Sequence, residues 1–223
     1  MNSQRSATIA QLVALAAALM LAGSAVPLTA QQPGAPVRDP RHIFQRDVES
    51  WTKLKRRNIV MQKQDYSCGA AALATVAKYY WGDFVDEAYF LDTIVAMLSP
   101  EQLADRIKNG LTLTDLRLAA VKRGYAATIG RLSYQELTES KVPLVVGITV
   151  RGYDHFVVYR GTDGYYVYLA DPIRGNIRLP AWEFVEQWQK NAVLVVAKPG
   201  ASVRDWSPLS VTCEETMLGE ANR

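Results

Sequence analysis

The stretch MQKQDYSCGAAALATVAKYY, residues 61–80, decides the fold and contains the first of only two cysteines in the chain. From Gly69 onward it is rich in Ala and apolar nearly all round, which predicts a buried helix that begins near Ser67 or Cys68. A sulfur at a helix N-terminus meets unpaired N–H groups and the helix dipole, which favour the reactive thiolate. Gly69 beside it would let a substrate backbone approach closely. Cys68 is therefore a candidate nucleophile.

A thiol nucleophile needs a base, and the sequence contains only two histidines. His42 lies in a Pro-rich segment, whereas His155 opens the apolar run HFVVY directly after a loop, where an imidazole can face a cleft. A lone histidine beside an apolar strand is often a satisfied interior residue, and this alternative stays open.

A carboxylate should orient the imidazole, and two aspartates are candidates. Asp171 ends the next run, YYVYLADP, and an antiparallel hairpin through GTDG would place it beside His155. Asp-Pro is also a common turn signal, so a purely structural role stays open. Asp154 is disfavoured because neighbouring residues on a strand point to opposite faces.

A developing oxyanion needs hydrogen-bond donors. Gln62 lies six residues before Cys68, on a segment that can fold back to place its amide beside the sulfur. The backbone N–H of Cys68 can supply a second hydrogen bond. Gln64 competes with Gln62 for this role.

The cysteines also allow a bland interpretation, a disulfide between Cys68 and Cys213. Two cysteines do not make a disulfide framework, and Cys213 lies in a polar segment beyond the last strand-like run. Two distant histidines and two distant cysteines supply no metal-ligand signature, so we expect no metal and no cofactor.

Residues 1–30 have the composition of a secretory signal peptide. Arg5 precedes the apolar block IAQLVALAAALMLAG, and small residues surround an expected cleavage point after Ala30. The apolar block falls short of the ~20 residues that a spanning helix needs, which disfavours an uncleaved anchor. We therefore expect a periplasmic protein with no stable membrane insertion after the signal is removed.

The remaining chain suits one domain. We predict a linker or mobile arm over residues 31–54, the folded domain over residues 55–199 and a polar tail over residues 200–223. Signal removal lowers the formal net charge of +3 by one, and so weak an imbalance gives no reason to expect nucleic acid as a partner. The basic cluster in residues 53–57 is predicted to be a solvated face.

Helical patterns precede strand patterns along the chain, which predicts an α+β fold. Its helical N-terminal half would pack on a C-terminal, mostly antiparallel sheet, with an active-site cleft between them. Besides the helix after Cys68, we expect helices over residues 85–98, 116–123 and 179–190. The helix over 116–123 would have Thr114 or Asp115 as its cap and Gly124 as its stop. A further short helix is expected at the capping box of Ser133 and Glu136. Strands are expected over 143–150, 155–161, 165–172 and 192–199.

A family resemblance rests on four elements in chain order: Gln62, Cys68-Gly69 with its alanines, His155 followed by FVVY, and Asp171-Pro172. Together they resemble the bacteriocin-processing peptidase domain, a papain-like cysteine peptidase family of ABC exporters that cleave double-glycine leaders. The resemblance covers roughly residues 58–198. It implies that Cys68 is the nucleophile and His155 the general base and then acid. It further implies that Asp171 orients the imidazole, that Gln62 donates to the oxyanion, and that a thioester forms.

The sequence departs from exporter-linked members in two ways. These members usually carry an acidic residue just before the cysteine, whereas this chain has Ser67, with Asp65 three positions before Cys68. The sequence also contains no Walker-type glycine loop, so double-glycine specificity does not follow. The layout is similar to stand-alone exported members associated with functional-amyloid secretion.

We therefore expect an exported cysteine endopeptidase that cleaves an exported protein or peptide, such as an amyloid or secretion-system client. Two alternatives stay open. A peptidase-derived binding module would capture such a client without cutting it. A thiol amidase or transpeptidase would use the same groups on peptidoglycan stems.

Overall fold

The computed structural model describes three ranges of the chain, residues 35–38, 43–46 and 50–217. The chain divides into two compact units, Met1–Val48 and Glu49–Arg223. Within the described ranges, no helix combines the length and the apolar character needed to cross a membrane.

The first unit contains a short hairpin. Strand β1 (Ala35–Arg38) pairs antiparallel with β2 (Ile43–Arg46). Both strands lie inside the predicted arm of residues 31–54, and the bounds of that arm stay a prediction. The predicted signal peptide of residues 1–30 and His42 lie outside the described residues.

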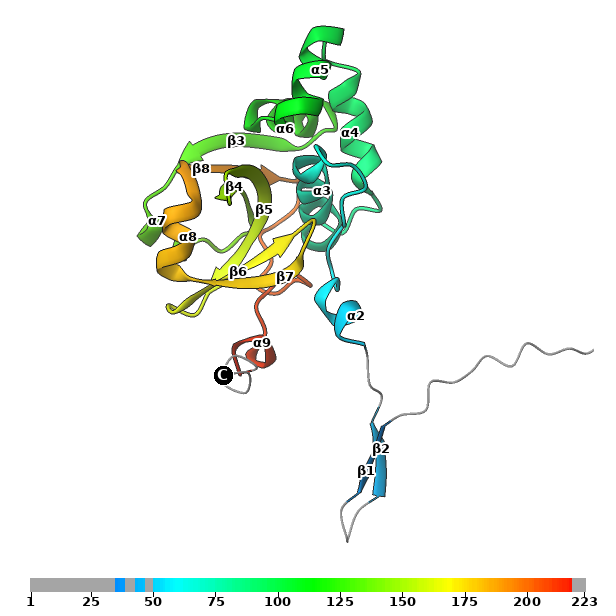
Figure 1. Ribbon diagram of the computed structural model, residues 1–223, viewed down its shortest axis with the longest axis vertical. Coiled ribbons are helices and arrows are strands. Elements are labelled where there is room, and N and C mark those ends of the chain that lie inside the picture. The colour runs from blue at the N-terminus through cyan, green and yellow to red at the C-terminus, as the bar shows by residue number, and fades with distance from the viewer. Residues whose placement is uncertain (1–34, 39–42, 47–49, 218–223) are drawn as a thin grey trace, which may run out of the picture. The chain divides into compact units, whose positions relative to one another are not determined.

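The second unit is built on a six-stranded antiparallel sheet with the order β3-β8-β4-β5-β6-β7 (Figure 1). Four of its strands correspond to the predicted runs, and these four are adjacent in the middle of the sheet. The two edge strands, β3 and β7, were not predicted because they mix glycine and polar residues with few β-branched ones. The strands are β3 (Ala126–Arg131), β4 (Leu144–Val150), β5 (Tyr153–Thr162), β6 (Tyr166–Asp171), β7 (Gly175–Pro180) and β8 (Trp188–Ala197).

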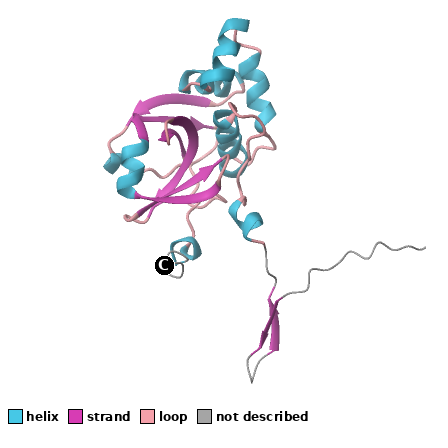
Figure 2. Cartoon of the chain, in the orientation of Figure 1, coloured by secondary structure: helices cyan, strands magenta, loops and turns pink. Residues whose placement is uncertain are grey.

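Helices cover both faces of this sheet (Figure 2). Helices α3, α4 and α6 pack on one another and against one side of the sheet, and α8 packs against β4, β6 and β7. The confirmed α+β architecture thus has its helical half mainly from the N-terminal part of the chain. The helical segments of this unit are α2 (Trp51–Lys55), α3 (Cys68–Thr75), the π-helical η1 (Val76–Tyr80), α4 (Glu87–Val95), α5 (Pro100–Asn109), α6 (Leu113–Lys122), α7 (Tyr134–Thr138), α8 (Ala181–Gln187) and α9 (Cys213–Met217).

Two apolar clusters form the core, one on each side of the sheet. The larger joins α3, α4 and α6 to the sheet through residues such as Leu73, Ile94 and Leu194. The smaller lies under α7 and α8 around Leu137 and Phe184. Every residue of α3 is buried, as its all-round apolar pattern predicts. The helix that begins at Cys68 is therefore held rigidly inside the unit.

The cap of helix α6 corrects one prediction. We expected Thr114 or Asp115 as the cap, but the N-cap is Thr112. The Thr112 hydroxyl accepts a hydrogen bond from the Asp115 backbone N–H (3.2 Å), and the Asp115 carboxylate accepts one from the Thr112 N–H (2.9 Å). A reciprocal capping box satisfies two end donors, which a single cap further along would not. Gly124 follows the helix at φ +87°, as expected of a stop.

Two further helix predictions were too long. The segment 85–98 forms α4 only over Glu87–Val95, and the unpredicted α5 follows from a capping box of Ser99 and Gln102. The segment 179–190 is helical only over Ala181–Gln187, because Trp188 already pairs with Ile148 in the sheet. Burial of the Trp188 indole in the smaller cluster favours the strand over another helical turn.

The described part of the predicted polar tail packs on the sheet. The guanidinium of Arg160, on β5, donates hydrogen bonds to the backbone oxygens of Leu209 (2.9 Å) and Ser210 (3.1 Å) and pairs with Glu215 (2.6 Å). Leu209 is buried in the larger cluster. The domain boundary at residue 199 stays a prediction, although contacts with the sheet extend past it.

Replacement of Gly175 by alanine is expected to lower the free energy of unfolding by roughly 2–4 kcal/mol. Gly175 has φ +83°, and a Cβ there would lie 2.4 Å from the backbone oxygen of Lys55. Gly164 is a matched control, since it has φ +93° with nothing within 4 Å of an added Cβ. Gly164→Ala should cost only about 1 kcal/mol of backbone strain. Urea unfolding measures both, and equal losses would contradict the steric argument.

Candidate active site

Helix α3 begins at Cys68, as the sequence predicts, and Ser67 is its N-cap. The thiol is nearly covered, with Cys68 6% exposed. The backbone N–H of Phe156, on β5, lies 3.5 Å from the Cys68 sulfur. Helix α3 packs directly on β5, so the sulfur lies where the helical half meets the sheet. The sequence predicts the active site at this junction.

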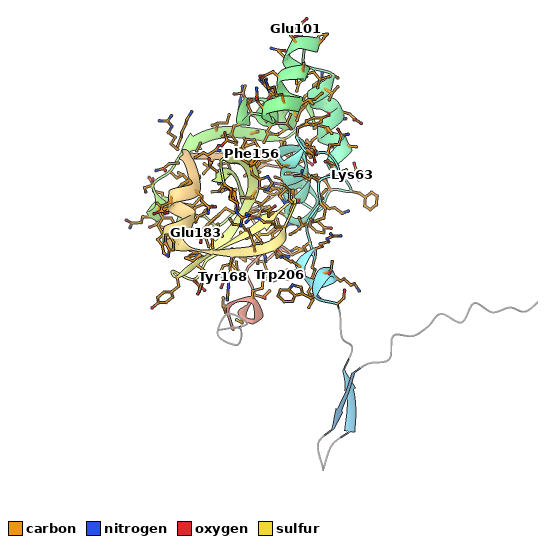
Figure 3. The ribbon with its side chains drawn as sticks, in the orientation of Figure 1. Lys63, Glu101, Phe156, Tyr168, Glu183 and Trp206 are labelled. Carbon is orange, nitrogen blue, oxygen red and sulfur yellow. The ribbon has the colours of Figure 1, made fainter. Side chains whose placement is uncertain are left out.

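Gly69 has a different function from the one we predicted. A Cβ at this position would lie 2.8 Å from both Leu116 methyl groups and 3.1 Å from the Phe156 ring. Figure 3 shows Phe156 on the side of the sheet toward α3. The missing side chain therefore makes room for α6 and β5, and the interpretation of Gly69 as a point of substrate approach is wrong.

His155 lies near the start of β5 and bonds to Asp171 at the end of β6. The distance from Nε2 of His155 to Oδ1 of Asp171 is 2.9 Å, and the two side chains are 10% and 0% exposed. The Cys68 sulfur lies beside this pair, since the backbone N–H of Phe156, the residue after His155, is 3.5 Å from it, and Cys68 interacts electrostatically with the imidazole. Because Nε2 bonds to Asp171, Nδ1 is the nitrogen left for the sulfur. The structure thus brings the three predicted residues into one chain of contacts.

This environment changes the pKa of the imidazole. Burial lowers the pKa of His155, but its hydrogen bonds and charge interactions with Asp171 and Cys68 outweigh burial and raise it to about 9. The folded protein therefore favours the imidazolium at neutral pH. An imidazolium beside a thiol favours the thiolate.

Asp171 is a fully satisfied buried carboxylate. Besides His155, it accepts hydrogen bonds from the backbone N–H groups of Ile173 (2.8 Å) and Arg174 (3.0 Å) and from Nε of Arg174 (2.5 Å). Burial raises the pKa of Asp171, but these partners, with His155 first, hold it well below its usual range. Arg174 was not predicted, although a basic residue three positions after the aspartate of an Asp-Pro turn was a signal that could have pointed to it.

Gln62 lies beside the same turn. Its backbone N–H donates to the Pro172 oxygen (3.0 Å), and its Nε2 donates to the Gln64 oxygen (2.9 Å). An amide nitrogen carries two hydrogens, so one remains for a substrate oxygen. Oε1 of Gln62 is buried without a hydrogen-bond partner in the described structure. Gln64, the competing candidate, contributes its backbone oxygen here.

Two alternatives were disfavoured by the sequence, Asp154 as the orienting carboxylate and a disulfide between Cys68 and Cys213. Asp154 is exposed and accepts a hydrogen bond from Oγ1 of Thr149 (2.9 Å), on the neighbouring strand. Cys68 and Cys213 are both free, Cys68 buried and Cys213 exposed. The described structure therefore does not form the disulfide that was the alternative to a free thiol.

A buried thiol at a helix N-terminus, an imidazole and a carboxylate at the junction of a helical layer and an antiparallel sheet define a papain-like cysteine peptidase. The profile of the Peptidase C39 family matches residues 56–200, and the chain belongs to this family. The match agrees with the extent of the resemblance that the sequence motifs suggested. The expectation of a cysteine peptidase is confirmed by this membership.

Two relatives and one solved structure are similar to this chain. A protein of Pseudomonas aeruginosa described as a probable functional amyloid protease, FapD, is 32% identical over 165 residues, covering 74% of this chain and 72% of that protein. Its namesake in Pseudomonas fluorescens is 35% identical over 147 residues, covering 66% of this chain and 63% of that protein. The crystal structure of the peptidase domain of Streptococcus ComA, a bifunctional ABC transporter, matches with a TM-score of 0.52 at 22% identity, covering 63% of this chain and 97% of that chain. The last match supports the fold alone.

Proposed function

We propose that this protein is an exported cysteine endopeptidase that cleaves a polypeptide client of a functional-amyloid system in the periplasm. In this proposal Cys68 is the nucleophile and His155 the general base and acid, oriented by Asp171, while Gln62 stabilises the oxyanion. The observation that carries it is that the imidazole bonds to a fully buried carboxylate, with Nε2 2.9 Å from Oδ1 of Asp171, directly beside the place where the Cys68 sulfur lies 3.5 Å from the backbone N–H of Phe156.

The proposed reaction is acyl transfer in two steps. The Cys68 thiolate attacks the carbonyl carbon of the peptide bond, and a carbon–sulfur bond forms. The oxyanion accepts hydrogen bonds from the free N–H of the Gln62 amide and from the Cys68 backbone N–H, which has no partner inside α3 because it lies in the first turn. His155 then donates its proton to the leaving amine as the carbon–nitrogen bond breaks. Finally His155 takes a proton from water, which hydrolyses the thioester and releases the thiolate.

Two observations support the client and the compartment. The names of the two Pseudomonas relatives describe probable functional amyloid proteases. The first thirty residues have the composition of a signal peptide with a cleavage point after Ala30. An enzyme exported in this way meets its client outside the cytoplasm.

The proposal predicts new protein termini that depend on the thiol. Strains that produce the natural protein or the Cys68→Ala variant should be compared by mass spectrometry of labelled N-termini in their periplasmic and secreted fractions. We expect at least one exported polypeptide to gain an internal terminus only with the natural protein. The same data should give Gln31 as the terminus of the enzyme itself.

A matched control is Cys213→Ser, which removes the exposed thiol and should leave the new termini unchanged. Identical termini with the natural protein and Cys68→Ala would reject cleavage. If a client then co-purified with both proteins, the non-cleaving binding module would replace the peptidase. Cleaved or exchanged peptidoglycan stems in place of cleaved polypeptides would instead indicate the amidase or transpeptidase.

A further inference from the structure

Glu87 is a buried acidic residue next to the active site that the mechanism above does not use. It is 2% exposed and is the first residue of α4, which packs on α3. Its Oε1 accepts a hydrogen bond from the Lys63 backbone N–H (2.9 Å) and one from the Ser67 hydroxyl. A buried carboxyl group needs such partners, because burial without them is costly.

The two partners of Glu87 flank the loop that carries the site. Lys63 directly follows Gln62, and Ser67 directly precedes Cys68. One oxygen atom therefore holds the neighbours of both the oxyanion donor and the nucleophile. Figure 3 labels Lys63 beside α3, on the side of the unit where this loop lies.

The loop is further closed on itself by Ser67. The Ser67 side chain is fully buried, and its hydroxyl lies 2.8 Å from the Gln64 backbone oxygen. Because the single hydroxyl hydrogen of Ser67 is donated to Glu87, the Gln64 oxygen is held by the Ser67 backbone N–H (3.2 Å) and by Nε2 of Gln62 (2.9 Å). The position of the Gln62 amide thus depends on the Gln64 carbonyl. Ser67 ties this carbonyl to Glu87.

We propose that Glu87 is a positioning residue that fixes the spacing between the Gln62 amide and the Cys68 sulfur. The inference rests on the proposed function, since it assumes that Gln62 stabilises an oxyanion. Without Glu87, the loop loses an oxygen that holds both of its ends. The thiol would remain at the start of α3, since α3 is buried along its whole length by other contacts. Loss of Glu87 should therefore impair reactions that pass through an oxyanion more than reactions of the thiol alone.

Two chemical probes separate these effects in the full mature protein carrying Cys213→Ser. Acylation of Cys68 by p-nitrophenyl acetate passes through an oxyanion, whereas alkylation by iodoacetamide does not. We expect Glu87→Ala to slow acylation about 100-fold, the effect of losing one oxyanion donor. Alkylation, read by mass spectrometry at Cys68, should change by less than about threefold, because α3 still holds the sulfur.

Three comparison variants sharpen the experiment. Glu87→Gln keeps an acceptor oxygen and should restore acylation to within about tenfold of the natural protein. Asp92→Ala removes an exposed carboxylate from the same helix and should change neither rate. The double variant Gln62→Ala with Glu87→Ala should be no slower in acylation than Gln62→Ala alone, because the two residues act through one donor.

Several results would overturn the inference. Equal slowing of acylation and alkylation would mean that Glu87 supports the thiol or the fold in general. Effects of Gln62→Ala and Glu87→Ala that multiply would mean that they act independently. A Glu87→Gln protein that folds but does not recover acylation would also contradict it. A natural protein whose Cys68 reacts with neither probe would instead reject the proposed function, and this inference with it.

Discussion

Replacement of His155 by alanine is expected to slow peptide cleavage by a factor on the order of 10⁴. The same variant should lose the reactivity of Cys68 toward iodoacetamide at neutral pH. Contacts with Asp171 and Cys68 raise the pKa of His155 to about 9, so the natural protein presents an imidazolium to the sulfur at pH 7. In His155→Ala the nearly covered Cys68 thiol loses this neighbouring positive charge.

The measurement is iodoacetamide labelling of the mature protein across pH 4 to 9, read by mass spectrometry at each cysteine. In the natural protein Cys68 should be labelled at neutral pH, because the imidazolium of His155 favours the reactive thiolate. In His155→Ala its labelling at neutral pH should be largely lost. Cys213 is exposed and serves as an internal control in every sample. If Cys68 labels equally in both proteins, the imidazole does not activate the thiol.

The chemistry of the site could be predicted from sequence because few residues were available to supply it. With two histidines and two cysteines in the chain, the choice of His155 and Cys68 needed only the predicted helix start and the predicted hairpin. The hairpin then places Asp171 within 2.9 Å of His155. These short-range arguments work because β5 and β6 are consecutive strands, so their pairing follows from the turn between them. The catalytic roles themselves stay predictions.

The residues that support the site could not be predicted, because they depend on contacts between distant segments. Glu87 reaches the loop before Cys68 only because α4 packs on α3. Gly69 is small because of Leu116, nearly fifty positions later, and no local pattern reveals this contact. Edge strands β3 and β7 were missed for a related reason. An edge strand buries less apolar surface than a central one, so its sequence shows a weaker strand pattern.

Replacement of Asp171 by asparagine is the second change with a large expected effect. The carboxylate accepts hydrogen bonds from His155, Ile173 and Arg174, so an amide would turn an NH₂ group toward donors. Removal of one partner from a buried charge pair typically costs about 3–5 kcal/mol of stability. We expect a loss of this size at pH 7 in urea unfolding. Cleavage should also slow by a factor on the order of 10²–10⁴, because the imidazole loses the group that orients it.

The pH dependence of stability tests whether this loss comes from the charge pair. The pKa of His155 is raised to about 9 in the folded protein, against an ordinary value of 6.5. Its contribution is therefore fully present below pH 6.5 and is lost as the pH rises toward 9, a fall of roughly 3 kcal/mol in the free energy of unfolding. In Asp171→Asn this fall should be largely absent, so the two proteins should converge in stability at high pH. Asp163→Asn is the matched control. Asp163 accepts hydrogen bonds from the backbone N–H groups of Tyr165 (2.9 Å) and Tyr166 (2.7 Å) and from the Tyr168 hydroxyl (2.7 Å), in an exposed turn. The Asp163→Asn variant should therefore lose the same amount of stability at every pH in this range. A constant difference between the natural protein and Asp171→Asn from pH 6 to 9 would show that the imidazolium is not stabilised by this carboxylate.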